Sequence, residues 1–160
     1  MTSYTIDINT FAIRHTLSAL GICNTAAEQL LIATTIAQAD FVYQTNAWGM
    51  GAYGIDEATH LTIWDNYLAF NPELASKVRG LASQHSFLQN PHAELATNLA
   101  YATAIAWVIY QSRGINLPQA GNGAALAECW SQLFCHGWQN DANKQRFASG
   151  VPGLSVEWAA

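Results

Sequence analysis

The chain has 160 residues, of which 51% are hydrophobic and only 11% are charged, and its formal net charge is −5. This length suits one domain with a full-sized core, and the acidic balance gives no electrostatic attraction for nucleic acid. Soluble domains usually have about a quarter of their residues charged, so we expect a neutral-polar surface or one partly covered by other subunits.

The helices expected in the first half of the chain are separated by clear stop signals. Residues 1–9 alternate in polarity and predict an extended arm, and a helix over 11–20 stops at Gly21. Thr25 with Glu28 has the spacing of a capping box and opens a buried helix that carries Gln38. Residues 42–55 are rich in glycine and aromatic residues and predict a loop or tiny β hairpin.

The second half of the chain reads as helical almost throughout. Helices are expected over 58–70, from Pro72 to about 80–83, from Pro91 to Arg113, over 124–135 and over 141–148. Apolar residues occupy most of 95–109, which predicts a buried central helix. We therefore expect a mainly α single domain over 10–150, with about six to seven helices and a tail over 151–160.

Neither a secretory signal nor a membrane span is expected from the sequence. Met1 to Asn9 has no basic start and no apolar centre, and the apolar stretch from Leu99 to Tyr110 is about half the length that a span needs. The three cysteines are an odd number, and Cys129 and Cys135 are too far apart along one predicted helix to bond each other, so we expect free thiols made in a reducing cytosol. They also lack paired zinc-ligand spacing, so we expect no metal site, and we expect no cofactor.

Three blocks of sequence, the first made of two segments, carry a resemblance to a known family. A buried helix over 30–41 is followed by Gly51-Ala52-Tyr53-Gly54-Ile55-Asp56-Glu57, and then by segments 63–75 and 98–105. In this order they resemble lysozyme-like lytic transglycosylases, especially the compact forms of phages and prophages. The resemblance covers roughly 26–137 and implies a lysozyme-like fold with a peptidoglycan cleft.

The sequence departs from that family where the cleft is expected. Gln38 and Ala39 occupy the places of the family's Glu-Ser pair, and Gly54 replaces a glutamine that contacts substrate. Phe134 and Cys135 stand where a Tyr-Asn pair is typical. Three departures at separate cleft positions predict that the chemistry has been lost.

The loss of the acid matters because cleavage of a glycosidic bond needs a proton delivered to the leaving oxygen. A glutamine amide has no proton to give at neutral pH, so we expect no catalytic residue. Asp40, Asp56 and Glu57 are the only fallback acids nearby. Asp40 lies about 200° round the helix from Gln38, and acids at 56–57 are ordinary helix N-terminal residues.

Several other residues have both a structural and a functional interpretation. With Gln38, Gly54 and Phe134, the aromatic residues Trp48, Tyr53 and Tyr101 would line a degenerate sugar-binding cleft, although core packing explains most aromatics. We expect His60 to be a capping or surface residue, and neither His85 nor His92 to bind a metal. Trp158 has little local core to join, so we expect it to dock onto a neighbouring subunit.

Three functions remain open. The favoured one is a non-catalytic, virion-associated phage protein of the tail, baseplate or head surface, assembled with other virion proteins or copies of itself through Trp158 and the terminal arms. Residual peptidoglycan binding is a compatible addition. The alternative is an active transglycosylase or lysozyme with a relocated acid. None of these involves nucleic acid or a membrane, and the first implies a protein made in the host cytoplasm and carried in the virion.

Overall fold

The computed structural model describes residues 8–45, 49–135 and 141–151, and the described part is mainly helical, as the sequence predicts. Its helices are α1 (Ile8–Ala19), α2 (Thr25–Thr45), α3 (Glu57–Asn66), η1 (Leu68–Phe70), α4 (Pro72–Leu81), α5 (Ser86–Gln89), η2 (Pro91–Ala93), α6 (Glu94–Thr97), α7 (Leu99–Ser112), α8 (Gly123–Leu133) and α9 (Asp141–Gly150). No strand occurs in these ranges, and a single bridge pairs Met50 with Ile55.

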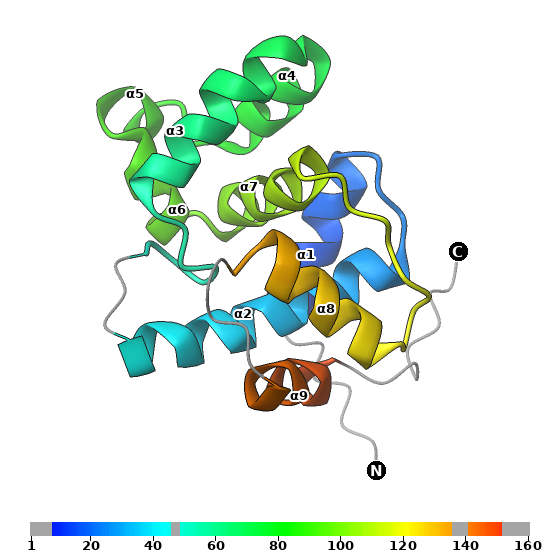
Figure 1. Ribbon diagram of the computed structural model, residues 1–160. Coiled ribbons are helices and arrows are strands. Elements are labelled where there is room, and N and C mark those ends of the chain that lie inside the picture. The colour runs from blue at the N-terminus through cyan, green and yellow to red at the C-terminus, as the bar shows by residue number, and fades with distance from the viewer. Residues whose placement is uncertain (1–7, 46–48, 136–140, 152–160) are drawn as a thin grey trace.

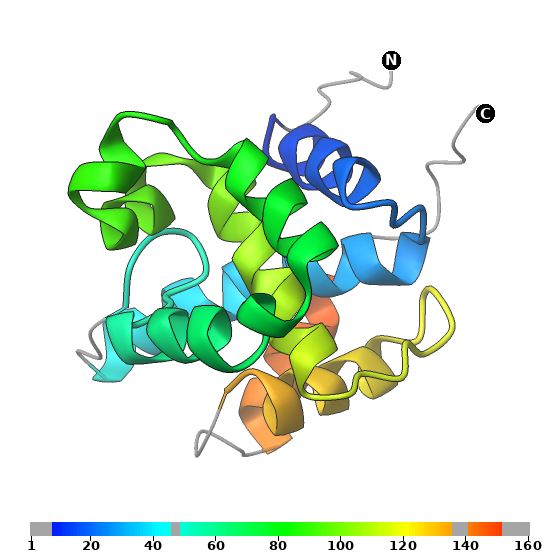
Figure 2. The same cartoon turned by 90° about the horizontal axis from the view of Figure 1, so that it is seen from above.

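Helix α7 is the centre of the fold (Figure 1). Every residue from Tyr101 to Tyr110 is buried, because α7 contacts α1, α2, α3, α4 and α6. In Figure 1, helices α3 to α6 lie on one side of α7, and α2, α8 and α9 lie on the other. Figure 2 shows α4 lying over α7. The expected buried central helix is confirmed, although it is shorter than its apolar pattern predicts.

The prediction of one helix from Pro91 to Arg113 is wrong, because Asn98 breaks it. Asn98 has an extended backbone (φ −127°, ψ 97°), and its side chain accepts a hydrogen bond from the backbone N–H of Tyr101. The Asn98 amide also donates to the carbonyl of Leu81 at 2.8 Å and to Glu94 at 2.9 Å. These tertiary partners stabilise a helix start at a place where the periodicity alone shows none.

Helix α2 differs from its prediction at both ends. Asn24, not Thr25, caps its start, with Oδ1 accepting from the backbone N–H groups of Ala26 and Ala27. The two carboxylate oxygens of Glu28 instead accept hydrogen bonds from Nη2 and Nε of Arg14, at 2.8 and 2.9 Å. The helix continues to Thr45, past the expected loop start at 42, because no glycine or proline interrupts it before Gly49.

Of the two predicted terminal arms, only residues 8, 9 and 151 are among the described residues. Helix α1 starts at Ile8, so the last two residues of the expected arm, 8 and 9, are helical. Residues 1–7 and 152–160, including Trp158, lie outside the described residues. The predicted docking role of Trp158 therefore stays a prediction.

Candidate functional site

Gln38 lies inside the protein, on the face of α2 that packs against α8 and the 49–55 turn. Its side-chain amide donates to the backbone carbonyl of Tyr53 at 3.2 Å, and its amide oxygen lies 3.4 Å from the indole nitrogen of Trp130, which donates to it. Only 5% of Gln38 is exposed. The amide thus joins three segments that are far apart in sequence, and both of its ends are engaged by the protein.

The aromatic residues around Gln38 are packed and hydrogen-bonded internally. The hydroxyl of Tyr53 lies 3.0 Å from that of Thr103 on α7, and Trp130 stacks on Phe147 of α9 with ring centroids 5.2 Å apart. Tyr53 and Trp130 are fully buried. Burial raises the pKa of Tyr53 well above its usual value, and the hydrogen bond with Thr103 opposes that shift only in part.

The residues predicted to line a sugar cleft fall into different surroundings. Tyr53 and Tyr101 are buried, so a ligand could reach them only if the surrounding side chains moved. Phe134 is half-buried against Tyr110, with ring centroids 5.2 Å apart. Gly54 lies in a turn with φ 56°, a left-handed conformation that a glutamine would adopt only with strain. Trp48 lies outside the described residues.

The fallback acids do not form a buried acid site. Asp56 is exposed, and its carboxylate accepts from the backbone N–H of Thr59 at 2.6 Å, which makes it the N-cap of α3. Glu57 is exposed in the first turn of the same helix. Both therefore have the helix-terminal role expected from the sequence. Asp40 lies on α2, but its side chain is outside the described part.

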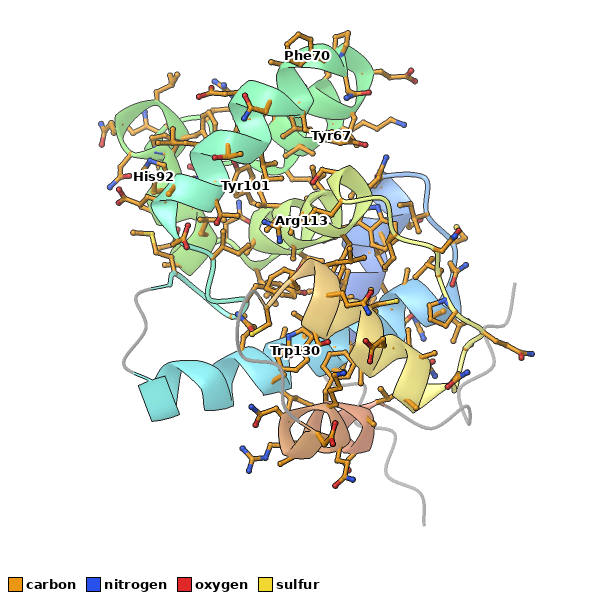
Figure 3. All side chains as sticks on the ribbon, in the orientation of Figure 1. Tyr67, Phe70, His92, Tyr101, Arg113 and Trp130 are labelled. Carbon is orange, nitrogen blue, oxygen red and sulfur yellow. The ribbon has the colours of Figure 1, made fainter. Side chains whose placement is uncertain are left out.

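A second polar cluster lies between α3, η2 and α7, and the sequence did not predict it. His60 Nε2 is 2.7 Å from the Tyr101 hydroxyl, which also accepts from the indole N–H of Trp64 at 2.9 Å. His60 Nδ1 is 2.9 Å from His92 Nδ1. Figure 3 labels Tyr101 and His92 in this cluster. Four side chains from three elements therefore form one continuous hydrogen-bonded chain.

The expectation that His60 is a capping or surface residue is wrong, because only 1% of it is exposed. Burial, and then the proximity of His92, lower the pKa of His60 from 6.5 to about 4. His60 is therefore neutral at physiological pH. The spacing of His60 and Ile63, the two buried residues of α3, was the available signal, since residues three apart share a helix face.

Glu94 is the second buried polar residue that sequence reasoning missed. One carboxylate oxygen accepts from the Asn98 amide and from the backbone N–H of Ser83, at 2.9 and 3.2 Å. The other oxygen is buried without a hydrogen-bond partner. With 1% exposure, this carboxylate holds the start of α7 against the segment after α4.

A pocket of about 390 Å³ opens between α3 and the C-terminal end of α7. Figure 3 labels two of its lining residues, Tyr67 and Arg113. Gln38 does not line it, nor do the other predicted cleft residues that the structure describes. A ligand in this pocket would therefore contact residues other than those that the resemblance indicates.

The described ranges hold no group of three or more His, Cys, Asp or Glu side chains placed to bind a metal ion. Within the same ranges, no helix combines the length and apolarity that crossing a bilayer requires. Comparison with known proteins gives no match, since no family model, no curated protein and no solved structure is significantly similar to this chain.

Proposed function

We propose that this chain is a non-catalytic, virion-associated structural protein of a bacteriophage, in its tail, baseplate or head surface, built on a transglycosylase-like body. The observation that carries the proposal is Gln38. An amide stands where the resemblance places the acid, and both of its ends are used to join α2, α8 and the 49–55 turn.

The environment of Gln38 supports a structural role for a second reason. A general acid must reach the substrate oxygen, within hydrogen-bonding distance or through one water. Gln38 is buried, does not line the pocket between α3 and α7, and faces a backbone carbonyl and an indole. Asp56 and Glu57, the described fallback acids, are exposed at the N-terminal end of α3, so neither lies in the kind of apolar pocket from which such an acid acts.

The surface of the α3–α5 region supports assembly with other subunits. Phe70, Leu88 and Leu61 are 78%, 75% and 51% exposed, in a chain with few charged residues. Phe70 lies at the outer edge of the molecule in Figure 3. Where exposed apolar side chains gather, they mark surfaces that other subunits cover, and these three are the side chains that such a contact would bury.

Retained glycan binding is a second candidate function, and the pocket between α3 and α7 favours it. Its wall combines the aromatic ring of Tyr67 with hydroxyl and amide side chains such as Thr59 and Asn66. A ring face together with neutral polar groups is the combination that binds sugars, and the pocket is within the usual size range of ligand sites.

The two proposals are tested separately. We expect mass spectrometry of purified particles to find the chain, and light scattering to show self-association that Phe70→Asp weakens. A monodisperse monomer absent from particles would contradict the structural proposal.

Binding to purified sacculi tests the glycan proposal. Loss of turbidity by permeabilised cells, abolished by Asp56→Asn or Glu57→Gln, would instead establish an active enzyme with a relocated acid.

A further inference from the structure

Among the described residues, Arg113 is the one charged side chain that lines the pocket between α3 and α7. It caps the C-terminal end of α7 and donates one N–H to the backbone carbonyl of Leu133. Two ion pairs join described residues, Arg14 to Glu28 and Lys144 to Glu128, and neither includes Arg113. A half-buried guanidinium therefore faces the pocket without a carboxylate partner in the described part of the chain.

The opposite wall of the pocket presents polar atoms that the fold leaves unused. The side chains of Thr59, Asn66 and Tyr67 line it and make no hydrogen bond within the described ranges. The hydroxyl of Thr62 on the same wall, and that of Ser112 next to Arg113, donate to carbonyls of their own helices, so both remain free to accept. A ligand would thus meet several neutral donors and acceptors on one side and a cation on the other.

We propose that this pocket binds an acidic sugar of the hexuronate class, with its carboxylate at Arg113 and its hydroxyls at Thr59, Asn66 and Tyr67. A planar guanidinium pairs well with a carboxylate, and such charge-assisted hydrogen bonds are about twice as strong as neutral ones. The inference rests on the glycan-binding part of the proposed function and adds to it the charge of the sugar.

Two features limit the affinity for a single sugar. The net charge of −5 repels an anion at long range, and the negative charge of Asp56 acts on Arg113. Burial lowers the pKa of Arg113, but a guanidinium stays protonated at any physiological pH. We therefore expect millimolar binding that weakens with added salt.

The test is a calorimetric or NMR titration of the full chain with galacturonate, galactose and acetate. We expect galacturonate to bind at least about tenfold more tightly than galactose or acetate, because only galacturonate uses both walls of the pocket. Asn66→Asp adds a negative charge to the pocket without touching the Arg113–Leu133 contact, and it should weaken galacturonate binding about tenfold. Gln89→Glu adds the same charge on α5, outside the pocket, and should leave it unchanged.

The outcomes separate this inference from the function on which it rests. Equal affinity for galacturonate and galactose, or equal affinity in the wild type and Asn66→Asp, overturns the acidic-sugar inference even if the chain binds sacculi. Acetate binding as tight as galacturonate reduces the pocket to a carboxylate site and overturns it too. Preferential galacturonate binding without sacculus binding supports the inference and contradicts the peptidoglycan proposal.

Discussion

Protonation of His60 should destabilise the fold below neutral pH. The imidazole is buried among Tyr101, Trp64 and His92, and its pKa falls from 6.5 to about 4 on folding. Between these values the unfolded chain binds one more proton than the folded chain, so the free energy of unfolding decreases as the pH falls. At about 1.4 kcal/mol per pKa unit, the full loss is roughly 3 kcal/mol.

This loss is large against a typical total stability of about 5–15 kcal/mol. The loss begins as the pH falls through about 6.5, where the histidine of the unfolded chain takes up its proton, and it is nearly complete at about pH 4. The maximum slope should be about 1.4 kcal/mol per pH unit for this one group. Carboxylates also titrate in the lower part of this window, so the measurement must isolate the histidine.

Urea unfolding of the wild type and of His60→Gln, monitored by tryptophan fluorescence, isolates the contribution of His60 to the pH dependence of stability. Glutamine keeps hydrogen-bonding capacity but does not titrate, so the wild type should lose roughly 3 kcal/mol more than the variant between about pH 7 and pH 4. His85→Gln, at an exposed position, should follow the wild type. Parallel curves for the wild type and His60→Gln, or an NMR titration of His60 near pH 6.5, would refute the reasoning.

Three further substitutions, and Gly21→Ala as a control for one of them, test the packing around Gln38 and the turn after α2. Gln38→Glu places a carboxyl group against the Tyr53 carbonyl, which raises its pKa, so stability should be full at acidic pH and fall by roughly 2 kcal/mol or more toward pH 8 in urea titrations; an unchanged pH profile would contradict this. Gly51→Ala puts a Cβ 1.8 Å from the Leu95 carbonyl oxygen at φ 71°, and should cost at least about 2 kcal/mol in chemical unfolding. Gly21→Ala, at φ 80° with open space, should cost only about 1 kcal/mol, and equal costs would show that the close approach is unimportant. Trp130→Ala removes a buried indole stacked on Phe147 and should lower the unfolding free energy by about 3–5 kcal/mol, whereas a loss below about 1 kcal/mol would mean that the site collapses without strain.

The helical class and most helix positions are readable from the chain because they depend on local signals. Asn71-Pro72 opens α4 as expected, and the apolar run on α7 marks the centre of the core. The same local signals mislead at Asn98, where apolar residues continue on both sides of a break. That break depends on Leu81 and Glu94, whose proximity to Asn98 is a property of the folded chain.

The candidate site, like the helices, can be predicted from the sequence only in part. Gln38 can be singled out from the sequence, and its inability to donate a proton follows from the amide alone. Its partners Tyr53 and Trp130 are 15 and 92 residues away, so the bridging role needs the tertiary structure. The same holds for the pocket, because Tyr67 follows α3, Arg113 follows α7, and no spacing relates them.

The sequence by itself determined the mainly α class, the positions of most helices and the absence of an acid at residue 38, since each depends on residue type and short-range periodicity. Only the tertiary structure decided which polar groups are buried together and which face a pocket. Burial is the main cause of the lowered pKa of His60, and Arg113 has no ion-pair partner among the described residues. Both surroundings are formed by helices that are distant in sequence.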